Sequence, residues 1–269
     1  MKLFYRKYGE GPTLIIVHGL YGASDNWVHV GKLLGKHFEV FIIDQRNHGR
    51  SPHSDTHNYH SMKKDLHEFI EEHSISKTIL VGHSMGGKTV MSYAGEYPEK
   101  INGLVVVDIA PKSYLNLVKT WKNTIDHGTI INAMNNVDFS TVKTRSDVDI
   151  ILKDHISIER IRQFLMKNLH RNKDQTFKWS LNLKAIKNNL NDILAGLNEN
   201  EYVSGNQITG FPVLFIRGSN SNYIMDEDFP LIHKIFPYAE IKTISEAGHW
   251  LHVEKPSFLV STILHYFIV

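Results

Sequence analysis

The stretch "VGHSMGG" (residues 81–87) sets a serine among small residues, in the pattern Gly-x-Ser-x-Gly formed by Gly82, Ser84 and Gly86. An apolar run that predicts a strand leads into it, and a predicted helix over 85–97 follows at once. A sharp turn at this place needs small neighbours because strand and helix approach closely, and it pushes the serine hydroxyl outward. The alternative is a glycine-rich turn with an idle serine, which the flanking strand and helix disfavour.

Strands and helices alternate outward from this turn on both sides. Predicted strands cover 2–9 (an edge strand), 13–19, 39–45, 77–84, 102–111, 211–218 and 239–244, and predicted helices cover 25–36, 59–73, 85–97, 226–236 and 256–268. The central strands are continuous apolar runs, which is typical of a mostly parallel sheet covered by helices on both faces. The sequence therefore predicts an α/β fold.

The alternation is interrupted once. Between Pro111 and the strand at 211–218 the chain shows only helical patterns, near 114–127, 146–154, 157–170 and 181–197. We therefore expect one α/β core domain made of residues 1–111 and 209–269. An all-helical cap, residues 112–208, is expected to be inserted after the strand that ends at Asp108.

The composition excludes several kinds of chemistry. The chain has 269 residues, of which 42% are hydrophobic and 22% charged, and its net charge of +2 is too small to indicate a nucleic-acid partner. The absence of cysteine excludes disulfides and thiolate nucleophiles. No run of 18 apolar residues indicates a membrane span, and the N-terminus shows no signal peptide, so a cytoplasmic location is expected.

A base that would activate Ser84 is predicted in "EAGHWLHVEKP" (246–256). His249 follows the last predicted strand, at the carboxyl edge of the sheet where Ser84 also lies. His252 competes with it but lies closer to the terminal helix, so it is expected to pack or to face solvent. His53, His57 and His60 have loose metal-like spacing, which chance explains in a chain with 17 histidines, and no metal or cofactor is predicted.

An oxyanion needs two backbone N–H donors near the serine. Met85, at the start of the helix, supplies one. Leu20 in "VHGLYGASDNW" (17–27) follows the end of the first buried strand and is expected to supply the other. Polar residues after the second buried strand could bind an anion, but they are expected to be structural: Asp44, Arg46, Asn47 and His48.

Three positions compete for the acid that would support His249. The turn after the strand at 211–218 has Ser221 where a carboxylate is expected, and Asp226, Glu227 and Asp228 follow in the first turn of a predicted helix. Asp108 is favoured over them, because a charged residue that ends a fully apolar strand is costly unless the strand opens into a polar site. Its alternative role is to cap the first helix of the inserted cap, and Ser221 is a secondary partner of His249 or Asp108.

Other residues carry weaker predictions. Lys88 on the helix after Ser84 is expected to pack its stem and expose its amine. Aromatic residues are expected mostly in the core: Tyr21, Trp27, Tyr114, Trp179 and Trp250. Tyr21 and Trp250 adjoin predicted site residues, so they are also expected, with Ser221, to contact substrate.

The motifs together resemble the α/β-hydrolase superfamily. The resemblance rests on "HGLYG", "DQRNHGRSP" (44–52), "GHSMGG" (82–87) and "AGHW" (247–250) and covers essentially the whole chain. More narrowly, "VVVDIAP" (105–111), "FKWSLNL" (177–183), "GSNSNY" (218–223) and "AGHWLHVEKP" look like small acyl-ester esterases of the bacterial YbfF type, with ABHD11-like hydrolases as relatives.

The resemblance implies roles for the predicted site residues. Ser84 would be the nucleophile, His249 the base, Asp108 the acid, and the N–H groups of Leu20 and Met85 the oxyanion hole. The resulting hypothesis is a serine carboxylesterase or thioesterase that acts on short- to medium-chain acyl esters, as a monomer or homodimer. A C–C bond hydrolase of the same fold and a non-catalytic ligand-binding module stay open as alternatives. Haloalkane dehalogenases and epoxide hydrolases are disfavoured because they would need an aspartate at position 84.

Overall fold

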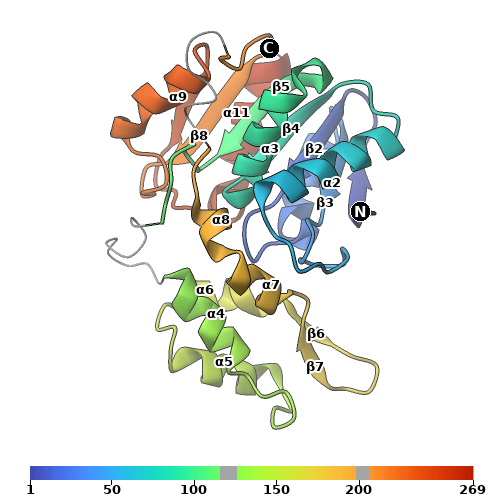
Figure 1. Cartoon of the computed structure of the whole chain (residues 1–269), viewed down its shortest axis with the longest axis vertical. Helices are drawn as coiled ribbons and strands as arrows, with labels where there is room; N and C mark the ends of the chain where they lie inside the picture. Colours follow the sequence, from blue (N-terminus) through green and yellow to red (C-terminus); the bar gives the residue numbers. More distant parts are fainter. Residues whose placement is uncertain (116–125, 198–205, 269) are drawn as a thin grey trace.

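The computed structural model describes residues 1–115, 126–197 and 206–268, and its centre is a seven-stranded sheet (Figure 1). In sheet order the strands are β1 (Tyr5–Tyr8), β3 (Glu39–Ile43), β2 (Thr13–Val17), β4 (Thr78–His83), β5 (Ile101–Val107), β8 (Val213–Gly218) and β9 (Glu240–Ile244). Only β1 is antiparallel to its neighbour. The carboxyl ends of the other strands therefore meet at one edge, and the predicted α/β fold is confirmed.

Helices cover both faces of this sheet, because successive side chains of a strand point to opposite sides. Leu14 and Ile16 of β2 pack in a core with α1 (Val28–Leu34) and α11 (Pro256–Ile268). Ile15 and Val17 pack in a second core, to which α2 (Tyr59–Glu72), α3 (Met85–Glu96) and α9 (Phe229–Ile235) contribute. The strands are buried on both faces, which explains their continuous apolar sequences.

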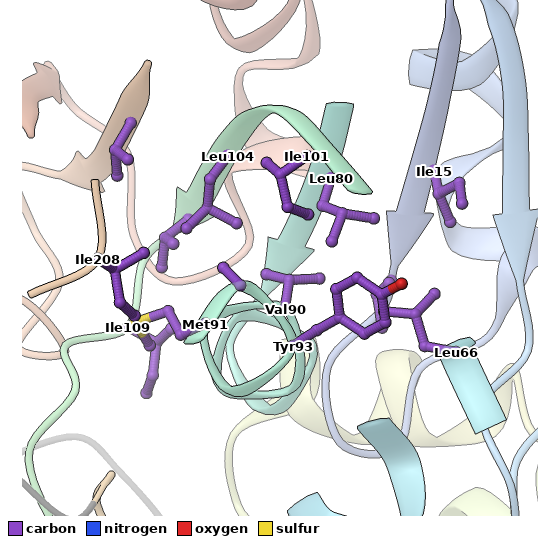
Figure 2. Packing of buried hydrophobic residues seen from close by; sticks show 14 of the residues in the cluster. Ile15, Leu66, Leu80, Val90, Met91, Tyr93, Ile101, Leu104, Ile109 and Ile208 are labelled. Carbon is purple, nitrogen blue, oxygen red and sulfur yellow. The ribbon is translucent and has the colours of Figure 1, made fainter. Parts of the chain in front are cut away.

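Packing around α3 fixes the helix that follows the Gly-x-Ser-x-Gly turn. Figure 2 shows Val90 and Tyr93 of α3 against the strands, close to Leu80 of β4, with Leu66 of α2 beside them. These side chains are fully buried or nearly so. Burying one such aliphatic side chain stabilises the fold by about 1.5–3 kcal/mol, so α3 is held firmly on the sheet.

The described α/β part of the chain also contains four short helical elements. They are η1 (Ser24–Trp27), η2 (Pro98–Lys100), η5 (Asp226–Asp228) and α10 (Leu251–Glu254). The helix predicted over 25–36 therefore begins with a 3-10 turn, and α10 precedes α11 after His249. No helix in the described part of the chain is long and apolar enough to cross a membrane.

We call the described residues 126–197, which lie between β5 and β8, the inserted segment. It holds α4 (His127–Asn135), α5 (Arg145–Lys153), α6 (Glu159–Met166), β6 (Leu169–Arg171), β7 (Phe177–Trp179), α7 (Leu183–Asn188) and α8 (Leu190–Leu194). It extends away from one edge of the sheet, in the lower half of Figure 1. The domain boundaries at 111/112 and 208/209 stay a prediction.

The expectation of helices alone in this segment is wrong at residues 169–179, where β6 and β7 pair as a hairpin. Leu169, Phe177 and Trp179 are buried while His170 and Lys178 are exposed, an alternation with period two that favours strands. The predicted helix over 157–170 therefore ends early.

Other boundaries in the inserted segment also differ from the prediction. The helix predicted over 181–197 is divided at Asn189 into α7 and α8. The sequence interpretation missed α4, whose first turn is capped by Asp126, with the Thr129 N–H donating to its carboxylate over 3.0 Å. Most of the helix predicted near 114–127 lies outside the described residues.

Candidate active site

Ser84 lies on a strained turn between β4 and α3. Its backbone has φ 53° and ψ −121°, a region that residues other than glycine rarely adopt. Such strain costs on the order of 1–3 kcal/mol and persists only where the surroundings hold it. Here the Ser84 N–H donates to the carbonyl of Val107 over 3.0 Å, which ties the turn to the neighbouring strand β5.

The small residues around Ser84 are required by close backbone approaches. A Cβ atom on Gly82 would lie 2.4 Å from the Gly86 oxygen, and one on Gly86 would lie 2.2 Å from the Val17 oxygen. Any side chain at these positions would force α3 away from β4 and β2. The Gly-x-Ser-x-Gly pattern is therefore explained by packing as well as by chemistry.

A second group at the same sheet edge joins His249 to Asp108. His249 Nδ1 lies 2.8 Å from Asp108 Oδ2, although the residues are 141 positions apart. The Asp108 carboxylate is fully buried and also accepts hydrogen bonds from the Gly218 N–H, at 3.1 Å to Oδ1, and from the Ser221 hydroxyl. A buried carboxylate is tolerable only when its oxygens are satisfied in this way.

Two residues that the sequence interpretation missed hold His249 in place. The Tyr223 ring stacks on the imidazole with a centroid distance of 3.8 Å and an interplanar angle of 18°. His83 Nε2 donates to the His249 carbonyl over 2.8 Å. Burial lowers the pKa of His83 well below its usual range, so His83 acts as a neutral donor. In the sequence, His83 directly precedes Ser84, and Tyr223 lies two positions after Ser221. This proximity to predicted site residues is the signal that could have identified them.

One cavity contains both Ser84 and His249. It encloses about 790 Å³ of empty space, part of it open to solvent. Its lining residues come from the turns at the sheet edge and from the inserted segment: Leu20, Tyr21, His83, Ser84, His127, Ile130, Arg160, Ile161, Phe164, Leu165, Tyr223, His249, Trp250 and Glu254. Tyr21 and Trp250 are thus at the cavity, whereas Ser221 is not a lining residue and uses its hydroxyl on Asp108.

Backbone donors for an oxyanion are available beside Ser84. Met85 is the first residue of α3, so its N–H has no partner within the helix. A Cβ on Gly19 would lie 3.0 Å from the Ser84 Cβ, so the loop that carries Leu20 runs directly against Ser84. Within the residues that the structure describes, no hydrogen-bond acceptor is found for the N–H of Leu20 or Met85.

Buried histidines fix this loop. His18 Nδ1 donates to the Gly19 oxygen over 2.8 Å, while its Nε2 accepts from the Gln45 N–H over 3.0 Å. The Tyr21 N–H donates to His48 Nε2 over 3.2 Å, and Tyr21 has a positive φ of 60°. The loop conformation is therefore determined by the segment after β3.

That segment otherwise holds the core together, as predicted. The Arg46 guanidinium makes two bonds to the Asp65 carboxylate, at 2.6 and 2.8 Å. Asp44 accepts from the Ser24 N–H over 2.5 Å, and the Asn47 carbonyl accepts from the Asn182 N–H over 3.0 Å. The side chains of Asp44 and Arg46 are therefore engaged in structural contacts.

Of the three acids after β8, Glu227 is exposed and the other two pair with basic side chains away from His249. Asp226 pairs with Arg217 at 2.6 Å, and Asp228 pairs with Lys112 at 2.7 Å and accepts from the Met225 N–H. Among the described residues, Asp108 is the carboxylate that contacts the His249 imidazole.

Lys88 corrects another prediction, because its amine is buried rather than exposed. The Nζ donates to the Ala195 carbonyl at the end of α8 and lies 4.7 Å from the centroid of the Tyr114 ring. Burial lowers the Lys88 pKa to about 7. The sequence could not indicate this, because the Ala195 carbonyl and the Tyr114 ring are distant in the chain and reach α3 only through the fold.

The remaining histidine and aromatic predictions can be placed in the fold. His252 is buried and stacks on Trp27 with a centroid distance of 4.3 Å, and burial lowers its pKa to about 3. His57 is buried, whereas His53 and His60 are exposed. No group of three potential metal ligands is found among the described residues.

The predicted core residues Trp27, Tyr114 and Trp179 are buried, and Trp179 Nε1 donates to the Met134 oxygen over 2.9 Å.

Known proteins resemble this chain in sequence and in structure. The model of the alpha/beta hydrolase fold family matches residues 12–256. An sn-1-specific diacylglycerol lipase ABHD11 of Danio rerio is 36% identical over 95% of this chain and 78% of its own length. The esterase YbfF of Escherichia coli is 32% identical over 96% of this chain and 93% of its own length. A solved marine microorganism esterase is 42% identical, with a TM-score of 0.91 over 99% of both chains.

Proposed function

Because this chain belongs to the alpha/beta hydrolase fold family, we propose that it is a serine carboxylesterase that hydrolyses short- to medium-chain acyl esters or thioesters. One observation carries the proposal. Ser84, on its strained turn, lines the same cavity as His249, and Nδ1 of His249 is hydrogen-bonded to the Asp108 carboxylate. Relatives named esterase and lipase support the same reaction class.

The first half of the proposed reaction acylates Ser84. With its Nδ1–H donating to Asp108, His249 keeps the lone pair on Nε2 and takes the proton of the Ser84 hydroxyl. The serine oxygen attacks the carbonyl carbon, and the N–H groups of Leu20 and Met85 stabilise the oxyanion. His249 then gives the proton to the departing alcohol or thiol, and the acyl group stays on Ser84.

The second half releases the acid. A water molecule takes the place of the leaving group, His249 removes one of its protons, and the resulting hydroxide attacks the acyl carbon. When the tetrahedral intermediate collapses, the bond to Ser84 breaks and the serine oxygen regains its proton from His249. The carboxylic acid leaves, and the buried Asp108 stabilises the imidazolium in both halves.

The inserted segment is proposed to act as a cap, part of residues 112–208, that shapes the acyl site. Its contribution to the cavity wall is mainly apolar and comes from α4 and α6: Ile130, Ile161, Phe164 and Leu165. Apolar walls favour an acyl chain of several carbons, because each buried methylene contributes about 0.8 kcal/mol. This supports short to medium chains as substrates.

Replacing Ser84 by alanine tests the proposal. The hydrolysis rate of p-nitrophenyl butanoate is expected to fall by about 10⁴-fold, because no covalent intermediate can form. Ser92→Ala is the matched control, since Ser92 lies on the same helix but does not line the cavity. A Ser84→Ala variant with near wild-type turnover would refute the proposal.

A fluorophosphonate probe separates the proposal from its alternatives. The wild-type protein should be labelled at Ser84, and Ser84→Ala should not be labelled. Failure to label a well-folded wild-type sample would favour a ligand-binding module. Labelling without release of acid from any ester or thioester would favour a C–C hydrolase.

A further inference from the structure

A second histidine faces the substrate cavity from the inserted segment. His127 is the first residue of α4, and its side chain lines the cavity together with Ser84 and His249. Its ring lies beside Tyr21, with a centroid distance of 5.7 Å. The mechanism proposed above gives this imidazole no task.

The His127 ring makes no hydrogen bond within the described part of the protein. Its Nδ1 is buried and has no partner. Its Nε2 also has no partner among these residues but is not sealed from solvent, so it is the ring atom that a ligand can reach. Buried polar groups without a partner are rare in proteins, and each one calls for an explanation such as a bound ligand.

The charge state of His127 restricts what the ring can bind. Burial lowers its pKa to about 4, so the imidazole is neutral near pH 7 and carries one proton. A buried N–H without an acceptor is rarer in proteins than a buried acceptor without a donor. The proton therefore belongs on Nε2, where the ring offers an N–H donor to the cavity.

The neighbouring wall makes this donor selective. Most of the other residues that the inserted segment contributes to the cavity are apolar: Ile130 of α4 and Ile161, Phe164 and Leu165 of α6. An all-carbon acyl chain fills such a space but leaves the donor unpaired. A site that can hydrogen-bond a substrate atom discriminates strongly against the analogue that lacks it.

We propose that His127 is a specificity residue: its Nε2–H donates a hydrogen bond to an acyl-chain oxygen other than the ester carbonyl. The preferred substrates are then esters or thioesters whose acyl chain carries a keto, ether or hydroxyl oxygen. This inference rests on the proposed esterase function and adds the substrate class to it.

Pairs of esters with equal chain length test the inference. Wild-type kcat/KM is measured for p-nitrophenyl pentanoate against the 3-methoxypropanoate and for p-nitrophenyl hexanoate against the 4-oxohexanoate and 5-oxohexanoate. Each value is divided by the rate of hydroxide-catalysed hydrolysis, which removes differences in intrinsic reactivity. At least one oxygen-bearing ester should be preferred by about tenfold.

Variants test whether His127 causes the preference for oxygen-bearing esters. His127→Phe and His127→Leu should bring the ratio of the normalised kcat/KM values close to one, and His127→Gln should restore part of the ratio. His170→Phe is the control, because His170 lies exposed on β6 and does not line the cavity. Arg160→Gln tests the other polar side chain from this wall, and it should leave the ratio unchanged.

Two results would overturn the inference: a wild-type ratio near one for every pair, or a ratio that survives in His127→Phe but is lost in Arg160→Gln. Both can occur in an enzyme that turns over esters and labels at Ser84, so they leave the proposed function standing. Absence of turnover and of labelling would instead refute the proposed function.

Discussion

The ends of β5 and β8 lie side by side, yet they contribute different chemistry to the site. Asp108 directly follows β5, and its carboxylate contacts His249. The N–H of Gly218, the last residue of β8, and the hydroxyl of Ser221 in the turn after it both donate to that carboxylate. One strand end therefore holds the negative charge, and its neighbour holds the donors that keep this charge buried.

This difference explains why the turn after β8 needs no acid. The Ser221 hydroxyl already donates a hydrogen bond to Asp108 Oδ2. A carboxylate in its place would put two like charges together in a buried site, where repulsion would force one of them to take up a proton. A hydroxyl in this position satisfies the acid without adding a charge.

Removing the charge at the end of β5 should have the largest effect. In Asp108→Asn the amide cannot stabilise the imidazolium, and its NH₂ group can turn toward Nδ1 and select the wrong tautomer. We expect kcat/KM for p-nitrophenyl butanoate to fall by about 10³- to 10⁴-fold. Thermal melting should verify that the variant is folded, and a folded variant within tenfold of wild type would contradict the assignment.

Removing one donor after β8 should have a smaller effect. Ser221→Ala leaves Asp108 with the Gly218 N–H and His249 as partners, so the carboxylate keeps these two hydrogen bonds but loses one charge-assisted bond. Such a bond contributes about 1.5–3 kcal/mol, and we expect kcat to fall about tenfold because only part of this energy acts on the transition state. Asn222→Ala, at an exposed neighbouring residue, is the control. A loss as large as that of Asp108→Asn would mean that the two strand ends are equally important.

The exposed acid beyond β8 should matter least. Asp226 pairs with Arg217, and its side chain is 80% exposed, so the pair contributes little. Asp226→Asn is expected to change kcat/KM by less than about twofold. If this variant lost acyl transfer while Asp108→Asn retained it, the roles of the two regions would be reversed.

Local patterns predicted the fold well and the inserted segment less well. The strands are long apolar runs that differ clearly from the helices, so β2 to β5 appeared at their predicted places. The hairpin β6–β7 was missed because two three-residue strands give too little alternation to distinguish them from a helix. Lys88 was misjudged because the carbonyl at Ala195 that accepts from it is 107 residues away.

Sequence alone determined the turn at Ser84. The pattern Gly-x-Ser-x-Gly directly between a predicted strand and a predicted helix is readable without the fold. The constraint on Gly82 is also local, because a Cβ there would meet the Gly86 oxygen, whereas the constraint on Gly86 comes from the Val17 oxygen of β2. Tertiary structure decided which acid meets His249, because that contact joins segments 141 residues apart and depends on which strands are neighbours. It also brought His127 to the cavity, since only the packing of the inserted segment against the sheet edge places that imidazole beside Tyr21.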